Sequence, residues 1–198
     1  MTKLLAATLA LLCAVAAAQT PPPTQRLRGA VQSFDGTTLV VNERNGTVVS
    51  LALADNFSIA EVLPIEATAI APGSYIGTAA LPGPDGSLRA LEVLVFPEAS
   101  RGTGEGHVPW DLEPGSTMTN ATVAQVVAAP QGRSMTLKYK DGEKTVVVPD
   151  GVPIVTFKPG DRTLLVAGAK VVVQAQVRDG KPTAVRALAG RNGFAPPM

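Results

Sequence analysis

The chain has 198 residues, of which 45% are hydrophobic and only 4% aromatic, and its formal net charge at pH 7 is +1. A charge this close to zero excludes proteins that hold nucleic acid through a strong basic excess. The single cysteine, Cys13, lies in an N-terminal apolar stretch, so composition excludes disulfides, thiolate metal sites and cysteine nucleophiles in the rest of the chain.

Residues 1–18 have the pattern of a secretory signal peptide, which is removed from the mature protein. Lys3 supplies the positive charge, residues 4–15 the short apolar region, and residues 16–18 the small-residue cleavage site. The apolar run is too short to anchor the chain and no second one follows, so we expect no transmembrane segment in the mature protein. Removal of Lys3 leaves equal numbers of acidic and basic residues. We therefore expect a periplasmic or secreted protein.

The remaining sequence contains two copies of one pattern. Residues 51–77 align without gaps on residues 146–172, and with one residue dropped the match continues from 85–94 to 179–188. Self-similarity at a fixed offset indicates a repeated structural unit. The matched residues are Asp55 with Asp150, Ile59 with Ile154, Pro64 with Pro159, Thr68 with Thr163, Gly73 with Gly168, Ala90 with Ala184, and Leu94 with Leu188.

The first copy is expected to form a β-module over residues 26–96, after a Pro-rich leader at 20–24. Its segments of alternating and β-branched residues predict strands, and Asp-Gly or Asn-Gly pairs predict the hairpin turns between them. In chain order the predicted strands cover 27–32, 39–41, 47–53, 74–81 and 88–96, with a short extended segment at 58–62 and a helical turn at 66–70.

The second copy repeats this order over residues 119–190. Between the copies lies a linker, residues 97–118, which is rich in Gly and Pro and contains the only His and the only Trp of the chain. The predicted strands of the second copy cover 119–128, 135–139, 144–148, 169–177 and 183–189, with an extended segment at 154–157 and a helical turn at 161–165.

Three strands, a connection with a helical turn and two further strands is the order of an OB-type barrel. Closing the strands into a barrel also removes exposed sheet edges. We therefore expect an all-β protein of two tandem five-stranded OB-like small barrels joined by a Gly/Pro-rich linker. The alternative is a meander sandwich that spans both copies.

Motifs in the linker and at the end of the chain carry a resemblance to a known group of proteins. They are Phe-Pro-Glu-Ala at 96–99, Arg-Gly-Thr-Gly-Glu-Gly-His at 101–107, Pro-Trp-Asp-Leu at 109–112, Pro-Gly-Ser at 114–116, Met-Thr-Asn at 118–120 and Pro-Pro-Met at 196–198. With the modules around them, they resemble exported bacterial proteins whose modules are similar to the family named domain of unknown function 5666. The resemblance implies a small exported β-barrel module and supplies no activity, cofactor or residue role.

The linker also contains the candidate site. Glu105, His107 and Asp111 lie close together in the sequence, and imidazole nitrogen and carboxylate oxygen both suit a divalent metal such as zinc or manganese. These three residues predict a mononuclear metal site. The alternative is a structured linker in which His107 and Trp110 pack between the barrels, with Arg101 and Trp110 as ligand-contacting or structural residues.

Catalytic patterns are weak in this chain. The serines that could pair with His107 lack a nucleophile-elbow pattern, and carboxylates on an irregular segment predict no catalytic distance. We therefore expect no enzyme, and no cofactor apart from the metal of the preceding hypothesis.

These observations favour an exported, non-catalytic binding or scaffolding protein of the cell envelope. Its partner, an envelope protein or a glycan, would lie in the cleft between the barrels with the linker as the floor. Nucleic acid is not expected, because aromatic stacking platforms are scarce and the charge is neutral. The alternative function is divalent-metal binding centred on His107.

Overall fold

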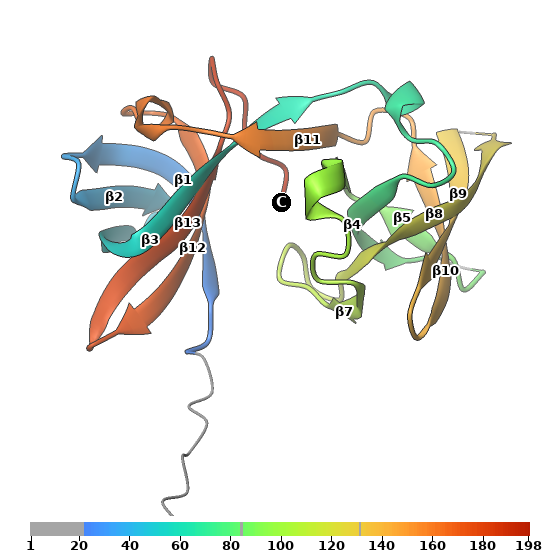
Figure 1. The fold of residues 1–198 in the computed structure, drawn as a ribbon, viewed down its shortest axis with the longest axis horizontal. Helices are drawn as coiled ribbons and strands as arrows, with labels where there is room; N and C mark the ends of the chain where they lie inside the picture. The colour runs from blue at the N-terminus through green and yellow to red at the C-terminus, as the bar shows by residue number, and fades with distance from the viewer. Residues whose placement is uncertain (1–21, 84, 131) are drawn as a thin grey trace, which may run out of the picture.

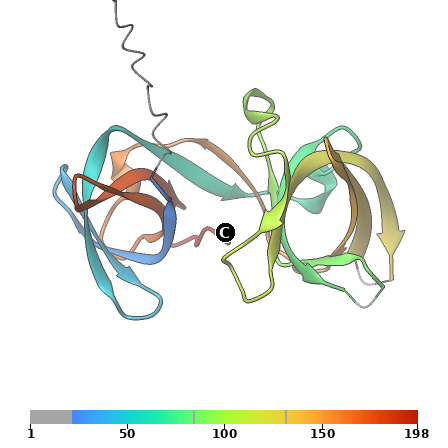
Figure 2. The ribbon, with the colours of Figure 1, turned by 90° about the horizontal axis from the view of Figure 1, so that it is seen from below.

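The computed structural model describes residues 22–198 except residues 84 and 131. This part of the chain is all-β, with thirteen strands and three short 3-10 helices, so the predicted fold class is confirmed at that level. Two groups of strands lie side by side, and the C-terminal residue lies between them (Figures 1 and 2). Within the described ranges no helix is long and apolar enough to cross a membrane. The expected signal peptide falls outside these residues.

Five strands form a closed mixed barrel. Three come from the N-terminal part of the chain and two from the C-terminal part, and neighbouring strands are antiparallel except for β3 and β13, which pair in parallel and close the ring. The five strands are β1 (Gln25–Phe34), β2 (Thr38–Glu43), β3 (Val48–Pro64), β12 (Lys170–Arg178) and β13 (Lys181–Ala189).

The barrel has the aliphatic core that the composition predicts. Leu39 and Leu51 face each other across β2 and β3 and are fully buried, and each such side chain contributes about 1.5–3 kcal/mol through burial. The first hairpin turn is fixed by Asp35, whose carboxylate accepts hydrogen bonds from the backbone N–H groups of Thr37 at 2.8 Å and Thr38 at 2.7 Å. The Asp-Gly turn signal at this position is therefore confirmed.

The second strand group consists of β4, β5, β8, β9 and β10. Strands β8, β9 and β10 form an antiparallel meander, β4 pairs with β8, and β5 pairs with both β4 and β10. The bounds are β4 (Tyr75–Pro82), β5 (Leu88–Ala90), β8 (Thr117–Ala129), β9 (Gly132–Tyr139) and β10 (Gly142–Pro149).

The other elements connect these two groups. Strand β7 extends the edge of β8, and β6 pairs with β4 and β11. Their bounds are β6 (Val93–Val95), β7 (Gly106–Pro109) and β11 (Ile154–Pro159), and the 3-10 helices are η1 (Ala67–Ala69), η2 (Glu98–Ser100) and η3 (Arg162–Leu164).

Strands β3 and β11 cross between the two groups as an antiparallel pair (Figure 1). At the centre of the pair Val62 lies opposite Phe157, and the sequence repeat makes these two residues equivalent. Pro64 pairs with Val155, and Pro159 pairs with Ala60. In the sequence alignment Pro64 is equivalent to Pro159 and Ala60 to Val155, so the two pairings are the same contact with the copies exchanged. A contact in which each side repeats the other is isologous and implies a two-fold axis. The pairing register at this crossing is therefore unchanged when the two aligned segments are exchanged, as around a pseudo-two-fold axis.

The crossing changes the expected organisation of the modules. We expected each barrel to close within one copy, 26–96 or 119–190, but the closed barrel joins three strands of the first copy to the last two of the second. The described structure shows this one closed barrel, with eight strands outside it. The cause is the length of β3, whose 17 residues merge two predicted extended segments. A strand that rises about 3.3 Å per residue carries the chain out of the barrel, and β4 and β5 form on the far side.

Candidate functional site: a cavity between the two strand groups

A cavity of about 530 Å³ lies between the closed barrel and the second strand group. This volume is within the range of small-molecule sites, about 300–1,000 Å³. The linker of residues 97–118, from here on called the connector, contributes part of the wall. Most of the wall is apolar and includes Leu94, Phe96, Met118, Phe157, Val172 and Leu188.

The apolar wall is organised around Phe96. Its ring lies 5.2 Å from the ring of Tyr75 and 6.0 Å from that of Phe157, the latter in an edge-to-face arrangement. Aromatic pairs of this geometry contribute about 0.5–1.5 kcal/mol beyond their burial. Because Tyr75 begins β4 and Phe157 lies on β11, this cluster holds the second strand group against the crossing pair.

Arg186 of β13 brings a cation to the barrel side of the cavity. Its guanidinium lies 5.2 Å from the centre of the Phe157 ring. Over the described residues, neither a hydrogen bond nor an ion pair of this guanidinium is found. Burial lowers the pKa of Arg186, but arginine remains charged under all ordinary conditions. The cavity therefore holds a partly desolvated cation without a counter-ion from the described chain.

Glu92 is on the opposite side of the cavity, between β5 and β6. Its side chain is fully buried, and neither carboxylate oxygen has a hydrogen-bond partner among the described residues. Burial raises the pKa of Glu92 to about 7. Desolvation of a carboxylate without full hydrogen bonding has this effect. The nearby Ala79 amide, which does not reach hydrogen-bond geometry, and the Arg28 charge have smaller, opposing effects.

Glu92 and Arg186 occupy equivalent positions, because the repeat aligns Ala90 with Ala184 and Leu94 with Leu188. Just before Arg186 the pairing register of β13 shifts, which marks a β-bulge. At the equivalent point of the first copy the chain is interrupted between β5 and β6. Bulges redirect side chains beside functional sites. The side chains of Glu92 and Arg186 therefore both point to the cavity because the regular strand is interrupted next to each of them.

Charge is divided between the two sides of the cavity. The cations Arg26 and Arg186 come from β1 and β13 of the closed barrel, whereas the acids Glu92 and Glu105 come from the opposite side and the connector. The barrel side of this largely apolar space therefore carries the cations, of which Arg26 is paired with Asp111, and the opposite side carries the acids.

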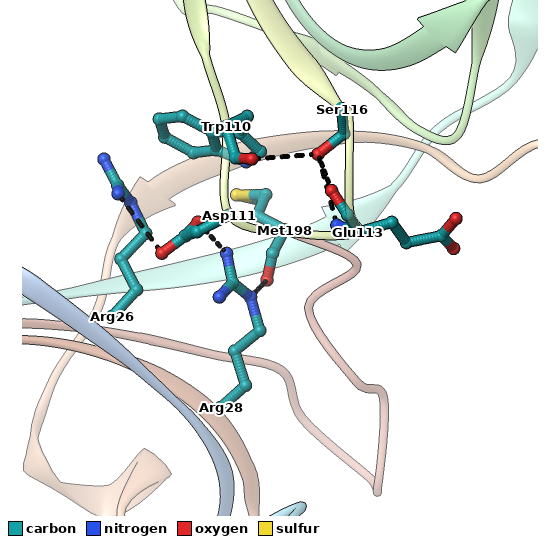
Figure 3. A network of polar contacts seen from close by, with 7 residues as sticks. All are labelled: Arg26, Arg28, Trp110, Asp111, Glu113, Ser116 and Met198. Carbon is teal, nitrogen blue, oxygen red and sulfur yellow. Dashed lines mark hydrogen bonds and ion pairs between the residues drawn. The ribbon is translucent and has the colours of Figure 1, made fainter.

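A polar network fixes the connector to β1 (Figure 3). Asp111 accepts a hydrogen bond from Arg28 Nη2 at 2.8 Å and pairs with Arg26 Nη1 at 3.5 Å. The Arg26 guanidinium lies 3.7 Å from the centre of the Trp110 ring, and Arg28 Nε donates to the carbonyl oxygen of Met198 at 3.0 Å. Burial raises the pKa of Asp111, but the hydrogen bond and charge of Arg28, with the charge of Arg26, outweigh it and leave that pKa lowered.

The turn of the connector closes on Ser116. Its hydroxyl lies 2.7 Å from the carbonyl oxygen of Glu113 and 3.1 Å from that of Trp110, and it accepts from the Glu113 N–H at 3.1 Å (Figure 3). This turn places the Trp110 indole in the cavity wall, where its N–H is buried without a partner among the described residues.

The predicted metal residues have separate partners. Glu105 Oε1 accepts from the backbone N–H of Lys140 at 3.0 Å, His107 Nδ1 lies 2.8 Å from Thr119 Oγ1, and Asp111 is paired with arginine. No group of three or more His, Cys, Asp or Glu side chains suited to a metal occurs within the described ranges. The structure thus does not bring these three residues together, and metal binding remains a prediction.

The two other predicted residues differ in their surroundings. Arg101 makes a bidentate pair with Glu98, at 2.6 and 2.8 Å, and donates to the carbonyl oxygen of Gly73 at 2.9 Å, which is a structural contact near the surface. Trp110 lines the cavity. The role of Trp110 as a ligand-contacting or structural residue stays a prediction.

Neither a protein-family model, nor a curated protein, nor a solved structure matches the chain. The description of the site therefore depends on its own residues. Sequence reasoning missed Glu92 and Arg186, which lie inside predicted strands. The signal that could have identified them is the repeat alignment, which places an acid and a base at equivalent positions among aliphatic residues.

Proposed function

We propose that the protein is an exported, non-catalytic binding protein of the cell envelope that holds a small, largely apolar ligand in the cavity between its strand groups. The observation that carries this proposal is the cavity of about 530 Å³, whose apolar wall contains a few convergent charged groups. This combination is characteristic of small-ligand sites.

The arrangement of two OB-like barrels belongs to the same proposal. In the closed barrel the third and fifth strands are parallel and the first pairs with the fourth, as in OB-type barrels. The second strand group repeats these pairings at equivalent residues. Tyr75 opposite Thr122 corresponds to Lys170 opposite Ala30. Membership in the exported family that the linker resembles is likewise a proposal.

The test uses a neutral, apolar fluorescent probe, N-phenyl-1-naphthylamine, titrated into the purified full chain. We expect saturable binding that also changes the emission of Trp110, the only tryptophan and a cavity residue. Leu94→Trp fills the cavity from a half-buried wall position and should abolish binding. The matched control is Val177→Trp on β12, where the side chain is 60% exposed and outside the cavity.

Two results would contradict the proposal. One is the absence of saturable binding to the unmodified chain. The other is equal binding by both tryptophan variants when circular dichroism shows that both are folded.

A further inference from the structure

We infer that the ligand is a small amphipathic anion, a carboxylate on an apolar body, whose charged group pairs with Arg186 on the barrel side of the cavity. This inference depends on the proposed binding function and specifies its ligand class. A fatty acid and the free C-terminus of a short apolar peptide share this chemistry.

The first step is the unmet charge of Arg186. Its guanidinium contacts the face of Phe157 at 5.2 Å, and the described residues provide it with no carboxylate. A cation held in a poorly hydrated place is costly unless it is paired. A planar guanidinium presents parallel N–H donors that match a carboxylate in a bidentate pair, one of the stronger hydrogen-bonded contacts available.

The second step distinguishes an anion from a cation or a zwitterion. The acid that could receive a cationic group is Glu92, but each of its carboxylate oxygens exposes less than 1 Å². Glu105, the other acid of the wall, already accepts from the Lys140 N–H. Arg186, by contrast, is only partly buried. The charge that remains accessible to a ligand is therefore positive.

The third step fixes the orientation of the ligand. Equivalent residues such as Leu94 and Leu188 line both sides of the cavity, so an apolar body alone would fit in either direction. The difference between the equivalent positions 92 and 186 removes this ambiguity, because an anionic group is attracted to the Arg186 cation and finds no cation at the buried Glu92. The apolar body then lies along Phe157, Leu188 and Leu94.

The experiment is isothermal titration calorimetry on the full chain with matched pairs of probes. Decanoate is compared with decanol and decylamine, and acetyl-leucyl-leucine with its C-terminal amide. We expect at least one carboxylate to bind about 10–100-fold more tightly than its neutral counterpart, as a hydrogen-bonded charge pair would provide. The probe that shows this preference distinguishes the two sources.

Variants assign the preference to Arg186. Arg186→Met should abolish the advantage of each carboxylate over its neutral counterpart, and Arg186→Lys should restore part of that advantage. The matched control is Arg89→Met, an exposed arginine of β5 outside the cavity wall. Circular dichroism melting confirms that each variant is folded.

Three results would overturn the inference. These are equal binding of each carboxylate and its neutral counterpart, tighter binding of decylamine than of decanoate, and an undiminished carboxylate preference in Arg186→Met. If the neutral fluorescent probe binds and no carboxylate is preferred, the inference fails while the proposed function stands. If no probe binds, both fail.

Discussion

The closed barrel and the second strand group are built from the same pairings but differ in charge and continuity. Strand β13 of the barrel is continuous over nine residues, whereas its counterpart is divided into β5 and β6 of three residues each. At the equivalent position the barrel presents Arg186 and the other group presents Glu92. In a homodimer of identical copies both positions would carry the same residue, but two copies on one chain can diverge. Having both segments on one chain therefore permits two similar sides of the cavity to carry different side chains at the equivalent position.

The experiment with the largest expected effect tests whether each strand group contains strands from both halves of the chain. Cutting the chain at a protease site inserted into the exposed turn 101–104 should leave both fragments in one particle, because each group contains strands from both sides of the cut. Size-exclusion chromatography of the nicked protein, followed by a denaturing gel, measures this. Separation of the fragments under native conditions would contradict the strand exchange and favour independent tandem barrels.

Alanine substitutions at equivalent core positions compare the stability of the two strand groups. Leu39 of β2 and Met135 of β9 occupy corresponding positions and are 0% and 1% exposed. Each change to alanine should lower the free energy of unfolding by about 2–5 kcal/mol through loss of burial and a residual cavity. Because the strands interleave, both variants should shift one common calorimetric transition. Two transitions, each sensitive to one variant, would show that the groups unfold separately.

Glu92 should make stability depend on pH. Its pKa is about 7 in the folded protein against an ordinary value of 4.5, so between these values the folded state holds a proton that the unfolded chain releases. The free energy of unfolding should therefore fall as pH rises from 4.5 to about 7. The change amounts to about 3 kcal/mol. Glu92→Gln cannot ionise and should be more stable than the parent at pH 8 by about that amount, with no gain near pH 4.

Urea unfolding across this pH range measures the difference between the two proteins. His107 titrates nearby, but its pKa is lowered by burial and by the charge of Lys144, so its contribution has the opposite slope. Subtracting the Glu92→Gln curve from the parent curve removes the His107 contribution. A difference that does not change with pH would show that Glu92 is solvated or paired.

The smallest effect concerns the attachment of the connector to the barrel. Asp111→Asn removes ion pairs to Arg28 at 2.8 Å and Arg26 at 3.5 Å. Because the Asp111 side chain is 48% exposed, we expect a loss of about 1 kcal/mol or less, smaller still at high salt. Urea unfolding at low and high ionic strength measures it. A loss above about 2 kcal/mol, independent of salt, would mean that the pairs are effectively buried.

The strands were predictable because alternation and turn chemistry act locally. The order of strands and the turns at Asp35 and Asp85 followed from such patterns. The exchange of strands between the two copies could not be predicted. The strand edges of both copies are similar, and the sequence does not specify which copy provides the pairing partner. Only the length of β3, where two predicted segments join without a turn, indicates a crossing.

The site was predictable only in part. The connector was expected to line a cleft, and Trp110 does line the cavity. Glu105, His107 and Asp111 lie close in sequence, but their side chains have different partners because an irregular segment does not fix side-chain direction. Glu92 and Arg186 reach the cavity through an interruption of their strands, and no periodicity of a regular strand predicts that placement.

The parallel pairing of β3 with β13 has a consequence for how the protein folds. The barrel joins Leu27 to Val173 and Ala52 to Thr183, so its ring cannot close until nearly the whole chain has been synthesised. Contacts so distant in sequence slow folding, because the loop entropy is lost before the contacts form. Until then the edges of β1 and β3 lack partners, and the same hairpin from another chain would fit them equally well. Ring closure should therefore be the slow phase of refolding, with a strand-swapped dimer as the product that competes at high concentration.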